Sequence, residues 1–177
     1  MKELKKAVIL VGHGGLPSDI PSEIVEKFMR IHKGRIKAGG SITEQEIELD
    51  TSIRKWERTP ENDPYKSGLE SLASHMEPML DGHILKTAYN EFCYPAIEDA
   101  VGELANENVT KIIIVTTMIT RGGSHSEFEI PDELKALRQK YSNIDIQYAW
   151  PFDIDAFALF LTTHIKNASP LSAVKSN

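Results

Sequence analysis

The stretch Ala7-Val8-Ile9-Leu10-Val11-Gly12-His13-Gly14-Gly15 decides the fold that this sequence predicts. Consecutive apolar residues that stop at a glycine are typical of a strand buried on both faces in a parallel sheet. Such sheets bind ligands just beyond the carboxyl ends of their strands. His13 lies in the turn at that position, and an imidazole can bind a metal ion or transfer protons near neutral pH. A turn histidine can also simply hydrogen-bond to nearby backbone, so this stretch alone leaves both roles open.

The composition is that of a globular protein. The chain has 177 residues, 41% hydrophobic and 26% charged, which is enough for one domain with a sizeable core. Its net charge of −6 argues against nucleic-acid binding. A single cysteine, Cys93, suits a reducing compartment, and the first residues leave no room for a signal peptide. With no apolar stretch of membrane-spanning length, we expect a cytoplasmic protein with no membrane partner.

Hydrophobic patterning predicts three more strands, each preceded by helical segments. The strands are expected at 83–89, 109–117 and 144–150. Helices are expected over 24–37, 44–56, 69–80, 95–104, 131–137 and 155–165. A capping box from Ser41 to Glu44 would open the second of these, Pro95 would open the fourth, and the fifth would start near Pro131. This alternation predicts an α/β fold, a four-stranded parallel sheet with helices on both faces.

The segment that connects the first and second predicted strands, here called the first crossover, is longer than a single connecting helix requires. We expect a single α/β domain over 1–167, with 38–66 as a helical insertion and 168–177 as a polar tail. The first helix would run back along the sheet, and the insertion would return toward His13.

Five charged or aromatic side chains of this crossover are candidates for contact with a ligand. Trp56, Arg58 and Tyr65 would then lie near the cleft mouth, although Trp56 could instead pack the insertion onto the sheet. Arg54, Lys55 and Arg58 could meet ligand carboxylates, or could form a solvated helix face.

Polar groups follow the other predicted strands at the same sheet edge. Glu91 follows the second strand, and Arg121-Gly122-Gly123-Ser124-His125 follows the third. Two imidazoles and a carboxylate can bind a divalent transition metal, or act as general bases. Arg121 could orient an anionic ligand, and the glycines would let backbone approach it closely. Glu91 could instead serve a helix N-terminus, and Cys93 is expected to be a buried, inert thiol.

These segments resemble those of the CbiX-type sirohydrochlorin chelatases. The resemblance lies in 11–15 (Val-Gly-His-Gly-Gly), 89–95 (Tyr-Asn-Glu-Phe-Cys-Tyr-Pro) and 122–131 (Gly-Gly-Ser-His-Ser-Glu-Phe-Glu-Ile-Pro). It implies ATP-independent insertion of Co²⁺, Ni²⁺ or Fe²⁺ into sirohydrochlorin or a related tetrapyrrole. No phosphate-binding or dinucleotide-binding glycine motif is present, in keeping with a reaction that uses no nucleotide.

The resemblance also implies residue roles. His13, His125 and Glu91 would be catalytic and would handle the metal. Gly14, Arg121, Gly122 and Gly123 would contact the tetrapyrrole. Gly15 stands where the family usually has Ser, and the long first crossover is not part of the minimal fold.

Two other functions fit the same residues. The protein could be a non-catalytic carrier or sensor of metal or tetrapyrrole, or a module that binds an anionic metabolite at its glycine turns. A single lobe offers one wall of a cleft, which predicts a homodimer unless the insertion forms the second wall.

Overall fold

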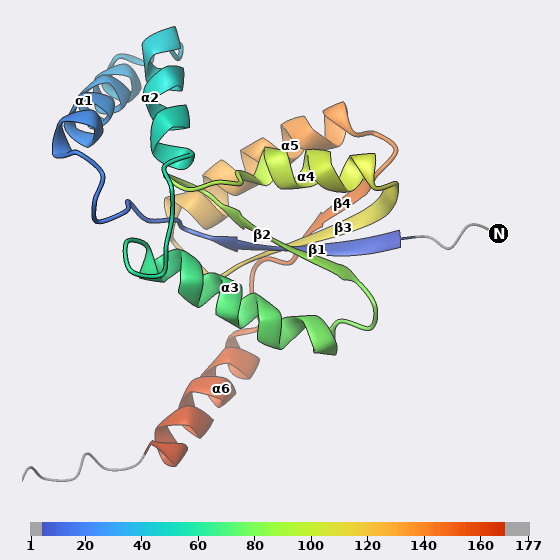
Figure 1. Ribbon diagram of the computed structural model, residues 1–177. Coiled ribbons are helices and arrows are strands. Elements are labelled where there is room, and N and C mark those ends of the chain that lie inside the picture. Colours follow the sequence, from blue (N-terminus) through green and yellow to red (C-terminus); the bar gives the residue numbers. More distant parts are fainter. Residues whose placement is uncertain (1–4, 169–177) are drawn as a thin grey trace, which may run out of the picture.

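The computed structural model describes residues 5–168, and its elements alternate as the sequence predicts (Figure 1). The strands are β1 (Lys5–Gly12), β2 (Ile84–Tyr89), β3 (Val109–Thr116) and β4 (Asp145–Tyr148). The helices are α1 (Ser22–Ala38), α2 (Glu44–Arg54), α3 (Pro64–Met76), η1 (Glu77–Met79), α4 (Ile97–Asn106), η2 (His125–Glu129), α5 (Ile130–Lys140) and α6 (Ile154–Asn167).

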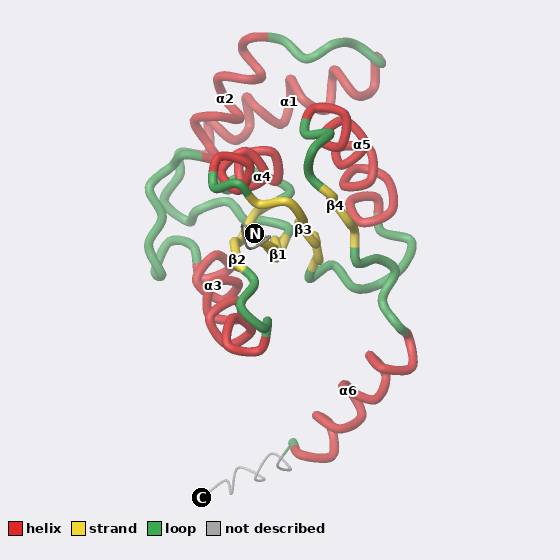
Figure 2. Tube along the Cα trace, turned by 90° about the vertical axis from the view of Figure 1, so that its right-hand side faces the viewer, coloured by secondary structure: helices red, strands yellow, loops and turns green. Residues whose placement is uncertain are grey.

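The strands form one parallel sheet in the order β2-β1-β3-β4. The step from β1 to β2 runs one way across the sheet, whereas the later steps run the other way. Since crossovers between parallel strands are right-handed, their helices fall on opposite faces. Accordingly α3 covers one face, and α4 and α5 cover the other (Figure 2). The predicted α/β fold with a four-stranded parallel sheet is confirmed.

Apolar side chains of the sheet divide into two cores. On the α4–α5 face, Ala7, Ile9 and Val11 of β1 are fully buried among the apolar residues of both helices. On the α3 face, Leu10 and Tyr89 meet a smaller set from α3. The central strand is therefore buried on both faces, as its unbroken apolar run predicts.

The first crossover is arranged differently from expectation. α3, not α1, packs against the sheet, while α1 and α2 pair with each other beyond the carboxyl ends of the strands (Figure 1). The buried carboxylate of Glu46 joins this pair, because Arg35 and His32 of α1 both hydrogen-bond to it. The projecting unit is thus α1 with α2; the bounds 38–66 for an insertion stay a prediction.

Local details correct two expectations. Thr43, not Ser41, caps α2, since its hydroxyl accepts from the backbone N–H of Glu46. Pro95 precedes α4 instead of opening it. The helix predicted to start near Pro131 begins at Ile130, directly after the π-helical turn η2.

Two remaining points concern the ends of the chain and its helices. The predicted polar tail lies outside the described residues, apart from Ala168. Within residues 5–168, no helix is both long and apolar enough to cross a bilayer.

Candidate metal-binding site

His13, Glu91 and His125 come together beyond the carboxyl ends of β1, β2 and β3. One potential ligand atom of each lies within 4.8 Å of the others. Their side chains are 40%, 29% and 24% exposed, so the cluster is half-buried and open on one side. The sequence predicted this convergence, and the structure has it.

The backbone of the loops after β1 and β2 holds His13 and Glu91 side by side. The N–H of Asn90 donates to the carbonyl of Gly12 at 2.9 Å, and that of Glu91 to the carbonyl of His13 at 2.8 Å. Gly14 has φ +93°, and a Cβ there would lie 1.8 Å from the carbonyl oxygen of Glu91. Only glycine permits this approach, which gives Gly14 a structural role in placing the two ligands.

Hydrogen bonds define which ring nitrogen of each histidine is free. Nδ1 of His13 lies 2.8 Å from the carbonyl oxygen of Gly14. A carbonyl can only accept, so Nδ1 carries the proton and Nε2 keeps its lone pair. That Nε2 lies 3.8 Å from Oε2 of Glu91.

His125 is oriented in the same way by a carboxylate. Its Nδ1 lies 2.8 Å from Oε2 of Glu129, one turn further along the chain. An ionised Glu129 accepts this proton and leaves Nε2 of His125 free, the carboxylate–histidine arrangement common around metal ligands. The amide nitrogen of Asn90 lies 3.0 Å from the same Nδ1 and 3.4 Å from Oε2 of Glu129, so Asn90 contacts both members of this pair. The rings of His13 and His125 lie 4.8 Å apart and nearly perpendicular.

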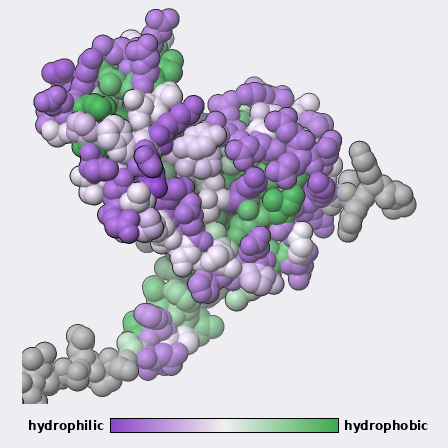
Figure 3. All heavy atoms as spheres, viewed as in Figure 1, coloured by the Kyte–Doolittle hydropathy of each residue, from purple (hydrophilic) through white to green (hydrophobic). Residues whose placement is uncertain are grey.

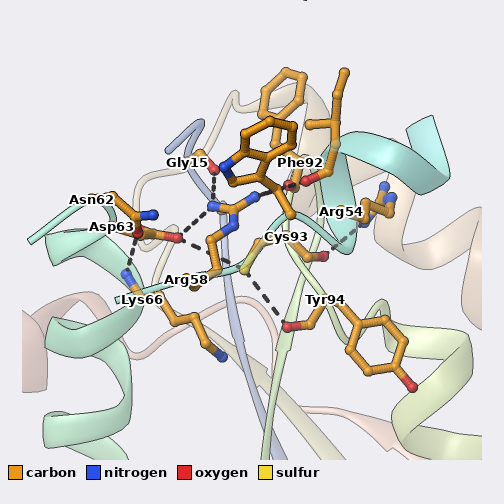
Figure 4. A network of polar contacts seen from close by, with 12 residues as sticks. Gly15, Arg54, Arg58, Asn62, Asp63, Lys66, Phe92, Cys93 and Tyr94 are labelled. Atoms are coloured by element: carbon orange, nitrogen blue, oxygen red, sulfur yellow. Dashed lines mark hydrogen bonds and ion pairs between the residues drawn. The ribbon is translucent and has the colours of Figure 1, made fainter. Parts of the chain in front are cut away.

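Arg58 ties the loops of the site to the first crossover (Figure 4). Its guanidinium, 6% exposed, donates to the carbonyls of Gly15 at 2.7 Å, Ile53 at 3.1 Å and Phe92, and forms an ion pair with buried Asp63. The expectation that Arg58 lies at the cleft mouth is therefore wrong. Both terminal nitrogens of its guanidinium donate within the protein, and Nε is buried without a partner among the described residues.

Arg54 holds the loop after β2 from the same side. It donates to the carbonyls of Cys93 at 3.2 Å and Asn90 at 3.1 Å, and pairs with Asp50. Acidic residues near Arg54 in the sequence favoured a solvated helix face for this side chain. Of its contacts, only the ion pair with Asp50 agrees with that expectation.

Burial acts on two groups close to the site, one fully buried and one partly buried, and both keep their protons. Cys93 is fully buried, as expected, and this burial raises the pKa of its thiol. Burial also raises the pKa of Tyr148 to about 12, so its hydroxyl remains a donor to the carbonyl of Ser126 at 3.0 Å. Tyr148 thereby connects the end of β4 to the segment that begins with His125.

The other residues that were predicted to contact a ligand lie in different parts of the structure: Arg121, Tyr65 and Trp56. Arg121 is 67% exposed and faces Glu127 at 3.6 Å. Tyr65 lies at the site, where its hydroxyl accepts from the backbone N–H of His13 at 2.8 Å. Trp56 instead donates to Asp19 and lines a groove of about 990 Å³ that none of the three candidate ligands borders.

A smaller cavity of about 280 Å³ lies between α1, α2 and the loop after β2. Glu91 and Phe92 form its border with the candidate metal site, Lys33 also lines it, and the charge of Arg54 is paired with that of Asp50. Sequence reasoning missed it, because α1 was expected on the sheet.

Known proteins share this architecture. A family model described as CbiX matches residues 61–164, more than half of the chain. The chain belongs to the CbiX family. The match begins after α2, so β1 with His13 and the α1–α2 pair lie before it.

Curated relatives of this CbiX protein are chelatases. It is 26% identical over 76 residues to a sirohydrochlorin ferrochelatase from Priestia megaterium, covering 43% of this chain and 28% of that protein. It is 31% identical over 72 residues to a sirohydrochlorin cobaltochelatase from Methanopyrus kandleri, covering 40% and 50%. The chain thus spans half or less of the length of these relatives in the matched regions.

Solved structures agree on the fold. SirB from Bacillus subtilis with Fe³⁺ superimposes with a TM-score of 0.54 at 16% identity, covering 94% of this chain and 49% of that chain. A cobalamin (vitamin B12) biosynthesis CbiX protein from Marinobacter aquaeolei VT8 gives 0.54 at 16% identity, covering 92% and 95%.

Proposed function

We propose that this protein inserts a divalent metal ion, Co²⁺, Ni²⁺ or Fe²⁺, into sirohydrochlorin or a related tetrapyrrole without using a nucleotide. The observation that carries the proposal is the cluster of His13, Glu91 and His125, whose ligand atoms lie within 4.8 Å. The names of the matched relatives, a ferrochelatase and a cobaltochelatase of sirohydrochlorin, support the reaction class.

Each residue of the cluster has a role in the proposed reaction. Nε2 of His13 and Nε2 of His125 hold the incoming ion, and as the ion passes to the macrocycle each freed Nε2 accepts one of the two pyrrole protons. Glu91 assists as a ligand or a proton relay. Donor atoms of a tightly bound tetrahedral ion lie about 3.4 Å apart, as bond lengths of about 2.1 Å require. The 3.8 Å between Nε2 of His13 and Oε2 of Glu91 is close to this separation.

The rim around the cluster would position the macrocycle. Gly14, Gly122 and Gly123 offer backbone without side chains, and Arg121 is exposed to meet a carboxylate. The cavity beside Glu91 would take one edge of the ring, with Lys33 near an acidic substituent. We further propose that the protein works in the cytoplasm as a two-fold homodimer, in which a second lobe supplies the other wall of the cleft.

Metal insertion can be followed by absorbance. Purified protein is mixed with sirohydrochlorin and each of Co²⁺, Ni²⁺ and Fe²⁺, and the rate above the uncatalysed reaction is measured. His13→Ala and His125→Ala should each lower this rate about 100-fold or more, the usual contribution of an acid–base group. His75→Ala, an exposed histidine on α3, is the matched control and should keep the wild-type rate.

The outcomes separate the alternatives. A wild-type rate in either site variant, with normal folding, removes that residue from the mechanism. Binding of both metal and tetrapyrrole without accelerated insertion would instead support a carrier or sensor.

A further inference from the structure

A histidine and a carboxylate also pair within the α1–α2 unit, outside the segment that the CbiX model matches. Nδ1 of His32 lies 2.8 Å from Oε1 of Glu46, whose side chain is 1% exposed. Nε of Arg35 donates to both oxygens of this carboxylate, at 3.0 and 2.8 Å, and thereby lowers the pKa of Glu46. Nη2 of Arg35 lies further from Nδ1 of His32, at 3.4 Å. The ionised carboxylate only accepts, so Nδ1 carries a proton and Nε2 of His32 keeps its lone pair.

This pair repeats the arrangement of His125 with Glu129 at the candidate metal site. In both pairs a glutamate oxygen lies 2.8 Å from Nδ1 of the histidine. A carboxylate in this position is common behind histidines that bind metal ions, since it fixes the ring and makes the other nitrogen more basic. The charge of Glu46 is already balanced by Arg35, so His32 is oriented by this carboxylate and is not needed to neutralise it.

His32 forms part of the wall of the cavity beside Glu91. Its ring stacks on that of Phe28, with 5.3 Å between centroids and 24° between planes. Phe28 in turn packs edge-on against Phe92, the neighbour of Glu91. The side chain of His32 is 30% exposed, and Nε2 has no hydrogen-bond partner among residues 5–168. A fixed imidazole with a free lone pair therefore stands in a cavity that borders the candidate metal site.

The charges of this cavity suit a cation, although two basic residues line it. Arg54 is paired with Asp50 and donates to two carbonyls of the loop after β2. Lys33 is exposed, so its flexible stem can hold the ammonium in water. Glu91 adds a carboxylate, 29% exposed, at the border with the candidate metal site. Imidazole binds the divalent ions of iron, nickel and copper, and carboxylate binds hard cations.

The cavity offers a route to Glu91 from the side of α1. Its volume of about 280 Å³ holds an ion with several waters, each of about 30 Å³. Lys33 and Ile36 line it and are exposed, so it opens to solvent there. Figure 3 shows both hydrophilic and apolar side chains on the surface of the α1–α2 pair. A macrocycle over the open side of the candidate metal site would block access from that side and leave this route.

We propose that His32 is an entry ligand for the substrate metal ion. Its Nε2 binds a hydrated Co²⁺, Ni²⁺ or Fe²⁺ in the cavity, and the ion then passes to the carboxylate of Glu91 and into the candidate metal site. The inference rests on the proposed function for the identity of the ion, and it adds the path by which the ion arrives. A single imidazole with water around the ion gives weak binding and fast exchange, as a transfer step requires. The ring edge would fill the same cavity, so the ion enters before the macrocycle.

Paramagnetic NMR tests this site without the reaction. The variant His13→Ala/His125→Ala lacks both imidazoles of the candidate metal site. Co²⁺ alone, added to this variant, should broaden the ring signals of His32 with an affinity about 10-fold or more above that for His75, as expected for a carboxylate behind the ring. His75 is the matched control, because its Nδ1 is bonded to a backbone carbonyl, that of Ser71. Equal broadening of the two histidines, or none at His32, would overturn the proposal.

A third substitution shows which atom holds the ion. His32→Gln, added to the same variant, keeps a donor for Glu46 but removes the imidazole. Co²⁺ should then no longer broaden the ring signals of Phe28, which stacks on His32 in the unsubstituted protein. Broadening of Phe28 that persists would place the ion on the carboxylates of the cavity and overturn the proposal.

Insertion kinetics test the entry role. In the otherwise unchanged protein, His32→Gln should raise the KM for Co²⁺ about 10-fold and leave kcat unchanged, because the ligand acts before the chemical step. His75→Gln should change neither constant. A lower kcat with an unchanged KM for His32→Gln would overturn the entry role, since a loss in the reaction or in the fold would explain it.

Failure of this proposal is distinct from failure of the proposed function. A wild-type protein that does not insert metal would overturn the proposed function and the entry role together, even where Co²⁺ binds His32. Wild-type insertion with the same KM for Co²⁺ in His32→Gln would overturn the entry role alone.

Discussion

Replacing Arg58 with methionine should cost the protein a large part of its stability. The substitution keeps most of the side-chain volume but removes the guanidinium. It leaves the carboxylate of Asp63, 2% exposed, without its ion-pair partner. It also removes the donor to three backbone carbonyls: those of Gly15, Ile53 and Phe92.

The magnitude follows from the buried pair. Breaking one by removing a single partner costs about 3–5 kcal/mol, since a buried charge is left uncompensated. The lost carbonyl bonds add to this cost but overlap with it, because the same loops relax in both cases. We expect a loss of about 4 kcal/mol, against a total stability of about 5–15 kcal/mol for a domain.

Urea denaturation followed by circular dichroism measures this loss. The double variant Arg58→Met/Asp63→Asn should recover part of it, because no buried charge remains and asparagine still caps α3. Arg54→Met, at a more exposed arginine that pairs with Asp50 within α2, should cost about 1 kcal/mol. A loss of less than about 1 kcal/mol in the free energy of unfolding for Arg58→Met would refute the reasoning. So would a double variant whose loss equals the sum of the losses of Arg58→Met and Asp63→Asn alone.

Three further predictions concern the site and the first crossover. Gly14→Ala should abolish metal affinity and lower the melting temperature, because the new Cβ overlaps a carbonyl oxygen; Gly15→Ala, where a Cβ would make only ordinary contacts at 3.7 Å or more, should be tolerated in both measurements. Glu129→Gln should weaken Co²⁺ binding, measured by calorimetry, about 10–100-fold with the fold unchanged, and equal affinity would contradict the orienting role. The Arg35 guanidinium lowers the pKa of Glu46 in the folded state. The stability that this pair contributes is therefore fully present at pH values above the usual pKa of a glutamate. It is lost as the pH falls through the lower pKa that Glu46 has in the folded protein. Hydrogen exchange in α1 and α2 should therefore rise below about pH 4, and Glu46→Gln should abolish that pH dependence.

The strands and the convergence of the candidate metal ligands were within reach of sequence reasoning. Apolar runs such as 7–11 and 109–116 are long and rich in β-branched residues, so period and composition agree. Once the strands are parallel, their carboxyl ends share one edge, and His13, Glu91 and His125 must converge there. No side-chain contact had to be known for that step.

Tertiary contacts decided what the sequence could not reveal. α1 has an apolar stripe that would suit a sheet, but Phe28 packs against Phe92 with 6.4 Å between ring centroids, and Glu46 joins α1 to α2. Arg58 stands among charged neighbours and gives no sign of burial, since the carbonyls of Gly15 and Phe92 that it meets belong to segments distant in the sequence. The π-helical turn that carries His125 has no sequence pattern of its own.

The two arginines link the first crossover to the chemistry of the site. Glu91 lies on a loop whose carbonyls at Asn90, Phe92 and Cys93 accept from Arg54 or Arg58. These donors come from α2 and the segment after it, which also form the cavity beside Glu91. Replacing 41–63 with a flexible linker would therefore release the Glu91 loop together with any wall for the macrocycle. The crossover is thus part of the scaffold of the cluster, and a role in tetrapyrrole binding has to be tested with side chains that face the cavity, such as Lys33, rather than by deletion.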